Sequence, residues 1–290
     1  MKNFKLNSPE KFVIRYKKLF IALLFIAFFV WQITFSLIEE YVTVPAGTFI
    51  HSLLLSLLFL YIYFMPEFKN FRANKAYKNL DLGLALDGAC KLAEVSSPKD
   101  VVISSTIRNN KAAYLIEAGR FSEAESELKL FFHIFDTRKL RPLMLFTVHI
   151  NFAILRIYNG DEKGYREQLK IIESYYDKIK KSKSKAEISI ADRDFSNIKF
   201  FEQAHFGQYS DNFEQRVLFD RIKFFGSKDR PKIYPIDYFD IYSILFTYFT
   251  RFENTEKAVY YANEIVKIGN DSFYEYRKAK EYLENANKCN

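Results

Sequence analysis

The sequence predicts an all-α protein in which a two-helix transmembrane hairpin is followed by an α-solenoid of helical hairpins. First, two long segments without Asp, Glu, Lys or Arg lie near the N-terminus, at Leu19–Ile38 and Val44–Phe64. Second, the 290 residues include only 9 Gly and 7 Pro, which fits long helices joined by short turns. Third, from Lys99 onward apolar residues recur at helical spacing between short polar turns.

The length of the two apolar segments predicts that they span a membrane. As a helix, Leu19–Ile38 would be about 30 Å long, which matches the hydrocarbon thickness of a bilayer. Val44–Phe64 is similar in length, and His51 is its only titratable side chain apart from tyrosine. A backbone inside lipid has to satisfy its own hydrogen bonds, so both segments are expected to be helical. Residues 19–64 are therefore predicted to form a transmembrane helical hairpin.

Basic residues flank this pair on both sides. Residues 1–18 form a basic tail of net charge +5, and residues 65–80 carry +3, whereas the connector holds two glutamates and no base. Positive residues stay on the cytoplasmic side, so the sequence predicts a two-pass protein of the cell membrane with both termini in the cytoplasm. Within the tail, Ser8 and Pro9 indicate the start of a short amphipathic helix. The flanking bases expected to contact the lipid bilayer are Lys17, Lys18, Lys69 and Arg72.

Two other interpretations of the apolar pair are less favoured. A cleaved signal peptide has a shorter apolar core, and the nearest cleavage-like triplet, at Val44–Ala46, lies beyond the usual limit of about 30 residues. A buried core hairpin of a soluble protein seldom contains two uncharged runs of this length. His51 is expected to be a neutral histidine near the outer interface rather than a functional group inside the membrane.

The net charge of +8 is mainly a feature of the N-terminal region. The 210 residues from Asp81 onward carry only +2, so we expect no nucleic-acid partner. Cys90 and Cys289 lie too far apart in sequence to suggest a zinc site or a disulfide framework. The four histidines are not paired at metal-ligand spacing, and no phosphate-binding or nucleophile motif is present. The sequence thus predicts a protein without cofactor, metal or catalytic residues, and not an enzyme.

Residues 65–98 are predicted to form a juxtamembrane helix. Four alternating leucines within Leu80–Leu86 have a strand-like period, but the neighbouring apolar residues also recur at helical spacing. The flanks are rich in Ala, Lys and Leu, which favours one helix over Phe71–Val95. Ser97 and Pro98 are typical of the start of a further helix.

The first hairpin after this point carries the most specific pattern. Its stretch GRFSEAESEL places a glycine, an aromatic residue, a Glu-Ala pair and a large apolar residue at Gly119, Phe121, Glu123, Ala124 and Leu128. This pattern resembles the inter-helix turn and second helix of a tetratricopeptide repeat (TPR). The aromatic residue usual near the start of that family's first helix is absent, since Arg108 stands there. Residues 99–290 are predicted to form a TPR-like α-helical repeat domain.

Three similar joints follow, near residues 160, 207 and 254. The joints are 41, 47 and 47 residues apart, against roughly 34 in the resembled family, so either the helices are extended or the repeats are degenerate. The last stretch, Ser272–Lys288, has one apolar and one charged face. We expect it to cap the solenoid.

The resemblance implies a protein-interaction function, because stacked helical hairpins form curved surfaces that bind peptides or proteins. The favoured hypothesis is a membrane-anchored TPR-like scaffold that presents a cytoplasmic protein- or peptide-binding surface at the inner membrane face. The alternative is an accessory or regulatory subunit of a membrane transport, secretion or envelope-assembly complex, bound through its transmembrane hairpin.

The same resemblance implies which residues face a partner. In the resembled family the first helix of each pair lines the concave side. Matched spacing from each turn then implies partner-binding roles for Asn109, Glu117, Asn197 and Arg251. The other interpretation is that each is an ordinary polar surface residue. The identity of the protein or peptide partner does not follow from the sequence.

Overall fold

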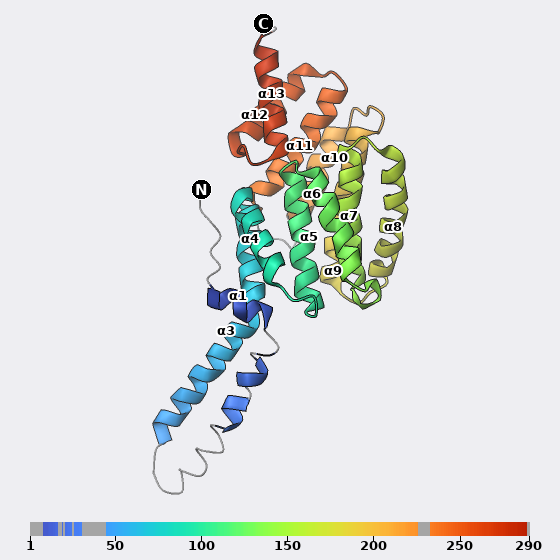
Figure 1. The fold of residues 1–290 in the computed structure, drawn as a ribbon. Coiled ribbons are helices and arrows are strands. Elements are labelled where there is room, and N and C mark those ends of the chain that lie inside the picture. Colours follow the sequence, from blue (N-terminus) through green and yellow to red (C-terminus); the bar gives the residue numbers. More distant parts are fainter. Residues whose placement is uncertain are drawn as a thin grey trace.

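The computed structural model describes residues 8–16, 19, 21–24, 26–30, 45–225 and 233–288 (Figure 1). Within these ranges the chain is helical between turns and contains no strand, which confirms the predicted all-α class. The helices are α1 (Ser8–Arg15), α3 (Pro45–Lys78), α4 (Leu82–Val95), α5 (Val101–Glu117), α6 (Phe121–Ile134), α7 (Pro142–Tyr158), α8 (Glu162–Lys180), α9 (Lys185–His205), α10 (Phe213–Phe225), α11 (Pro235–Arg251), α12 (Thr255–Ile268) and α13 (Tyr274–Lys288). A short 3₁₀ turn, η1 (Thr137–Lys139), precedes α7.

Helix α3 contains the second of the two segments expected to cross a membrane. It does not end near Phe64 but continues to Lys78, and its polar C-terminal half packs on α4 as part of the helical array. Across the described ranges, no helix combines the length and the apolar character needed to cross a bilayer. This contradicts the expected two-pass location in the cell membrane with both termini in the cytoplasm. Residues 31–44, the end of the first segment and the connector, lie outside the described ranges.

Neighbouring helices pack as pairs, which makes the fold repeat-like. Helix α3 packs on α4, α5 on α6, α7 on α8 and α11 on α12. The first helices also contact one another in the order α5, α7, α9 and α11, and α11 returns to contact α3. Helix α10 is an exception, because its main neighbour is α11 rather than α9. Five inner helices, α3, α5, α7, α9 and α11, therefore form a row whose two ends meet (Figure 1).

Four joints between paired helices share one backbone geometry. The second residue after the first helix has a positive φ in each: Leu80 (61°), Gly119 (73°), Gly160 (67°) and Glu253 (57°). The amide of the next residue donates to the carbonyl five residues earlier, as in a Schellman motif, and the same residue is the N-cap of the second helix. The joint near Gly207 lacks this geometry. Repetition of one short turn gives four pairs the same connection.

The first of these joints interrupts the helix expected over Phe71–Val95. Residues 79–81 turn the chain, and Leu80 adopts the left-handed conformation, which costs about 1–2 kcal/mol for a residue with a Cβ. Two tertiary contacts offset that cost. The Leu80 side chain is buried, and its carbonyl accepts a hydrogen bond from Asn270 Nδ2 at 2.7 Å. The segment 65–98 thus holds the end of α3 and all of α4, while the predicted division of the chain into domains stays a prediction.

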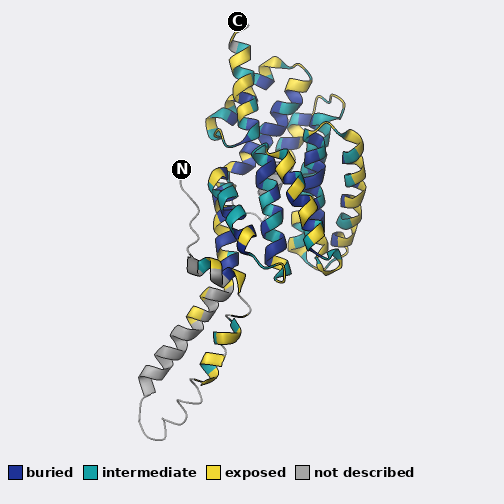
Figure 2. Ribbon diagram, viewed as in Figure 1, coloured by how far each residue is buried: buried dark blue, intermediate teal, exposed yellow. Residues whose placement is uncertain are grey.

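The C-terminal segment connects the last helical pair to the first ones. Phe273 is fully buried, and its ring lies 6.5 Å from that of Tyr77 in α3 and 4.7 Å from that of Phe239 in α11. Arg277 of α13 donates to the carbonyl of Ala118 at 2.8 Å, beside the joint between α5 and α6. Figure 2 shows the buried residues on the helix faces that meet and the exposed ones on the outer faces. Helix α13 therefore joins parts of the array that are far apart in sequence.

Helix α1 packs against the beginning of the array. Ile14 is buried in a cluster with Met65 of α3 and Leu92 of α4. Lys69 of α3 is also buried, and its ammonium lies 2.6 Å from the carboxylate of Glu10. The apolar face of the predicted amphipathic helix thus contacts protein.

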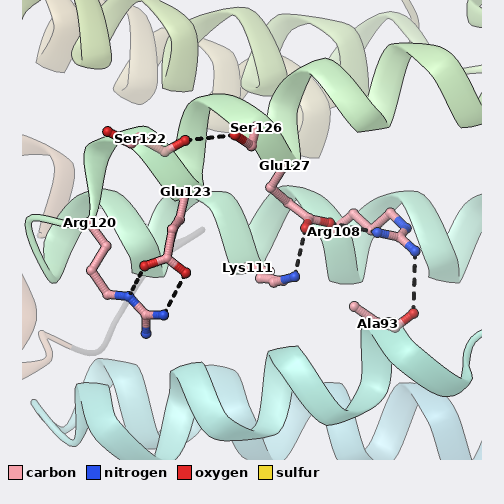
Figure 3. A network of polar contacts seen from close by, with 8 residues as sticks. All are labelled: Ala93, Arg108, Lys111, Arg120, Ser122, Glu123, Ser126 and Glu127. Carbon is pink, nitrogen blue, oxygen red and sulfur yellow. Dashed lines mark hydrogen bonds and ion pairs between the residues drawn. The ribbon is translucent and has the colours of Figure 1, made fainter.

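A polar network joins α4, α5 and α6 (Figure 3). Glu127 of α6 is only 6% exposed, and its carboxylate lies 2.7 Å from Arg108 and 2.6 Å from Lys111, both on α5. Arg108 also donates to the carbonyl of Ala93 in α4 at 3.4 Å. Arg108 stands where the resembled family has an aromatic residue, and its guanidinium connects α4, α5 and α6.

Candidate functional site

The inner helices enclose a recess of about 350 Å³. Its lining comes from α3, α5, α7, α9 and α11 alone, the first helices of the successive pairs. The volume equals about a dozen water molecules and lies at the lower end of the range for ligand sites. The recess is partly open to solvent, and its walls combine amides, carboxylates and aromatic rings.

A pair of buried asparagines joins two of the walls. Asn151 of α7 donates through Nδ2 to Oδ1 of Asn109 of α5 at 2.9 Å. Asn109 in turn donates to the hydroxyl of Thr147 at 3.4 Å, and Thr147 donates to the carbonyl of Met144 at 3.0 Å. Buried amides need such partners, because an unsatisfied donor or acceptor costs about 1–3 kcal/mol. The chain fixes the orientation of the amides at the boundary between α5 and α7.

Further amides line the recess with fewer internal partners. Asn110 of α5 donates to Oδ1 of Asn70 at 3.3 Å, and Tyr114 donates to Oδ1 of Asn74 at 2.6 Å. Asn197 of α9 makes no hydrogen bond to the described part of the chain, so both its carbonyl and its amino group are available to a ligand.

Glu117, near the C-terminal end of α5, supplies a carboxyl group deep in the recess. Burial and, to a smaller extent, the nearby carboxylates of Asp240 and Glu275 together raise its pKa to about 8, whereas the interaction with the Tyr77 hydroxyl opposes the shift. The pKa of Tyr77 is raised by burial and then by Glu117 and Asp240. Lys278 lies 3.3 Å from Glu275, and Arg193 interacts with Asp240, so these bases offset part of the negative potential. Glu117 holds a proton near neutral pH.

The opposite wall contains an arginine among acids. Arg193 of α9 donates through Nε to Asp194 at 2.6 Å, and the carboxylates of Asp237 and Asp240 on α11 also act on it. Burial lowers the pKa of Arg193, and these three aspartates more than offset that effect, so its pKa is raised. Asp237 also accepts a hydrogen bond from the amide of Tyr234 at 2.8 Å, which caps α11. The recess thus already accommodates one guanidinium.

The structure brings three of the four predicted partner-binding residues together. Asn109, Glu117 and Asn197 come from two helices and line this one recess. Arg251 does not: it is exposed near the end of α11 and lines a separate pocket beside His205. Its guanidinium donates to the carbonyl of Gln203 at 3.4 Å. The α11 residues that line the recess are Ile236, Asp237 and Asp240, and Arg251 lies about three helical turns beyond the last of them.

The predicted lipid-contact residues have different surroundings. Lys17 and Lys18 lie outside the described residues. Lys69 is buried and paired with Glu10, and Arg72 is exposed on α3.

Sequence reasoning missed Tyr77, Asn151, Arg193 and Asp240. One signal was available for the amides. An asparagine stands nine or ten residues before the joint residue in four successive first helices, at Asn70, Asn109, Asn151 and Asn197. The acids and Arg193 show no such spacing, and Asp237 and Asp240 reach the recess because α11 returns to contact α3.

Comparison with known proteins gives no match to a family model, to a curated protein or to a solved structure. The function is therefore argued from the recess itself.

Proposed function

We propose that this protein is a TPR-like helical-repeat binding module whose central recess holds a short segment of another protein or a free peptide. The observation that carries the proposal is the recess of about 350 Å³, in which amide side chains from successive first helices face one space. Inner surfaces of stacked helical hairpins are typical binding sites for extended partner segments.

The chemistry of the walls supports a peptide as the ligand. A peptide group has one donor and one acceptor, and an asparagine side chain offers both in the complementary order. Asn197 has its full hydrogen-bonding capacity left, and Asn110 keeps an acceptor oxygen. Apolar side chains such as Ile150, Ile154 and Phe201 stand between the polar ones and would contact the partner's side chains.

The repeated joints support the TPR-like part of the proposal. Leu80, Gly119, Gly160 and Glu253 adopt the same left-handed conformation, and each precedes an N-cap. The chain departs from the TPR pattern at Arg108 and in the length of its repeats. The likeness is therefore proposed for the arrangement of the helices rather than for membership of the family.

The role we propose is binding and not catalysis. The scaffold and subunit hypotheses based on a transmembrane hairpin both require a membrane span, and they are not carried forward.

A peptide library tests the proposal. We expect the full chain to select peptides from an immobilised random hexapeptide library and to bind the selected sequences in solution. The Ala113→Leu substitution places a larger side chain on the recess wall and should weaken binding by at least about tenfold, because it occupies the ligand's space.

The matched control is Ala186→Leu, which adds the same side chain at an exposed position of α9 outside the recess. Circular dichroism and thermal unfolding verify that both variants are folded. The proposal fails if no peptide is selected, or if Ala113→Leu binds the selected peptides as tightly as Ala186→Leu does.

A further inference from the structure

We propose that the recess recognises a basic side chain of its peptide, the ammonium of lysine or the guanidinium of arginine, with Glu117 and Asp240 as its counter-charges. This inference rests on the proposed function and specifies the chemical class of the bound segment.

The charge of the lining points to a cation. Four carboxyl groups line the recess, at Glu117, Asp194, Asp237 and Asp240, against two bases, Lys78 and Arg193. Both bases already have neighbours: Arg193 bonds to Asp194, and the Lys78 ammonium lies 4.7 Å from the centre of the Tyr234 ring. Asp237 and Asp240 also act on Arg193, and Glu117 is protonated near pH 7, so the lining carries an excess of one negative charge at neutral pH and of two when Glu117 ionises. Negative charge in a partly enclosed space attracts a cationic group and disfavours an acidic one.

The aromatic residues of the recess fit the same ligand. Tyr77, Tyr158 and Phe201 line it beside Glu117, and aromatic faces attract ammonium and guanidinium groups. Tyr158 is held in place by ring contacts with Tyr274 at 5.6 Å and Phe121 at 5.0 Å. A pocket wall held in this way is preorganised, which lowers the cost of binding.

The carboxyl groups are arranged for an organic cation rather than for a metal ion. Across the described residues, no group of three or more Asp, Glu, His or Cys side chains converges as a metal site requires. In the recess the acids come from α5, α9 and α11 and surround a space much larger than a metal ion. An alkylammonium or a guanidinium has the size and the spread of donors to meet them.

The surroundings of Glu117 couple cation binding to proton release. The groups that face it are Tyr77 on α3, Tyr158 on α7, Asp240 on α11 and Glu275 on α13. Two bases offset part of the charge of these acids, since Lys278 lies 3.3 Å from Glu275 and Arg193 interacts with Asp240. With a pKa of about 8, Glu117 carries a proton at pH 7. A bound ammonium favours the carboxylate, so the proton leaves to solvent and the cation takes its place. Affinity should then rise with pH, by at most tenfold per unit, and level off above about pH 8.

The test uses n-butylammonium as the probe and 1-butanol as its uncharged match, with the full chain followed by NMR chemical-shift titration. We expect n-butylammonium to shift the resonances of residues around the recess and to bind at least about tenfold more tightly than 1-butanol. Its affinity should rise between pH 6 and pH 8, a range in which the alkylammonium itself stays charged. Glu117→Gln should remove this rise, and Asp240→Asn should weaken binding at every pH.

The matched control is Glu123→Gln, which neutralises an exposed carboxylate on α6 that pairs with Arg120. Glu117→Gln resembles the protonated glutamic acid in shape, so it should fold, and Asp240→Asn gives an independent reading if it does not. The inference is overturned if 1-butanol binds as well as n-butylammonium, or if both recess variants titrate like the control. If Ala113→Leu blocks peptide binding but Glu117→Gln leaves it unchanged, this inference is wrong and the proposed function stands. If the protein binds the cation but no peptide, the proposed function is wrong instead.

Discussion

At the scale of the residue, Glu127 shows how one carboxylate determines the packing of several helices. It is buried on α6, and both of its partners, Arg108 and Lys111, come from α5 and retain little exposed surface. Charges taken out of water are tolerated only when they are paired, so the two bases depend on this one acid. Arg108 then carries the link on to Ala93 of α4 (Figure 3).

We predict that Glu127→Ala lowers the free energy of unfolding by about 3 kcal/mol, because it leaves two partly buried bases without a counter-charge. Urea denaturation measures the change. The control is Glu123→Ala, which breaks the exposed pair with Arg120 and should cost no more than about 0.5 kcal/mol. Equal losses in the two variants would contradict the role given to Glu127.

His205 supplies a pH dependence at the same scale. Burial and, to a smaller extent, the cations Lys278 and Arg251 together lower its pKa to about 4. The unfolded chain takes up this proton near pH 6.5, before the folded one does, so the stabilisation is present above pH 6.5 and is lost as pH falls towards 4.

We expect the stability of the wild type, relative to that of His205→Gln, to fall over this interval by at most about 1.4 kcal/mol per pH unit. Urea denaturation of both proteins between pH 4 and pH 7.5 measures the difference, and the subtraction removes the contribution of all other titrating groups. A difference that stays constant with pH would show that His205 is not shielded from protonation.

At the scale of the element, the helix–turn–helix joint is the repeated unit. Gly119 and Gly160 provide positive φ at two joints, but their surroundings differ. A Cβ at Gly119 would lie 2.7 Å from Cδ2 of Tyr274, whereas nothing lies within 4 Å of a Cβ at Gly160. The first joint is therefore constrained by its backbone and by α13, and the second by its backbone alone.

Two alanine substitutions separate these contributions. Gly160→Ala should cost about 1 kcal/mol, the usual penalty for a left-handed residue with a Cβ. Gly119→Ala should cost at least about 2 kcal/mol, because α13 has to move as well. Thermal and urea unfolding give both values. If the two losses were equal, Tyr274 would not be packed against this joint.

At the scale of the whole molecule, the C-terminal segment closes the helical array. Phe273 packs between α3 and α11, Asn270 holds the joint at Leu80, and Arg277 holds the joint at Gly119. The recess depends on this closure, because α11 and α3 line it from opposite ends of the sequence.

We predict that Phe273→Ala costs about 3–5 kcal/mol and also loosens the joint at residues 79–81. Hydrogen exchange should show faster exchange at this joint, which lies almost 200 residues away in sequence. The control is Leu169→Ala, a cavity in the separate cluster between α7 and α8, which should not affect the joint at matched stability. If residues 79–81 stay protected from exchange in Phe273→Ala, the packing of Phe273 between α3 and α11 does not close the array.

Periodicity predicted the helical class and three of the joints, because helical spacing and turn residues are local properties of a sequence. The joint at Leu80 was not predictable in that way, since a leucine with positive φ is stable there only through Asn270 and its own burial. The two apolar segments led to a wrong prediction of a two-pass location in the cell membrane. Hydropathy did not indicate that α3 continues past Phe64 to Lys78 or that it packs on α4.

By itself the sequence determined that this chain is helical, that its helices are paired by short turns, and that Asn109, Glu117 and Asn197 lie on first helices. Only the tertiary structure decided that those three residues share one recess with Tyr77, Arg193 and Asp240. The reason is physical: helix formation and turns depend on residues a few positions apart, whereas the recess requires contacts between residues far apart in sequence, such as those of Phe273 with α3 and α11.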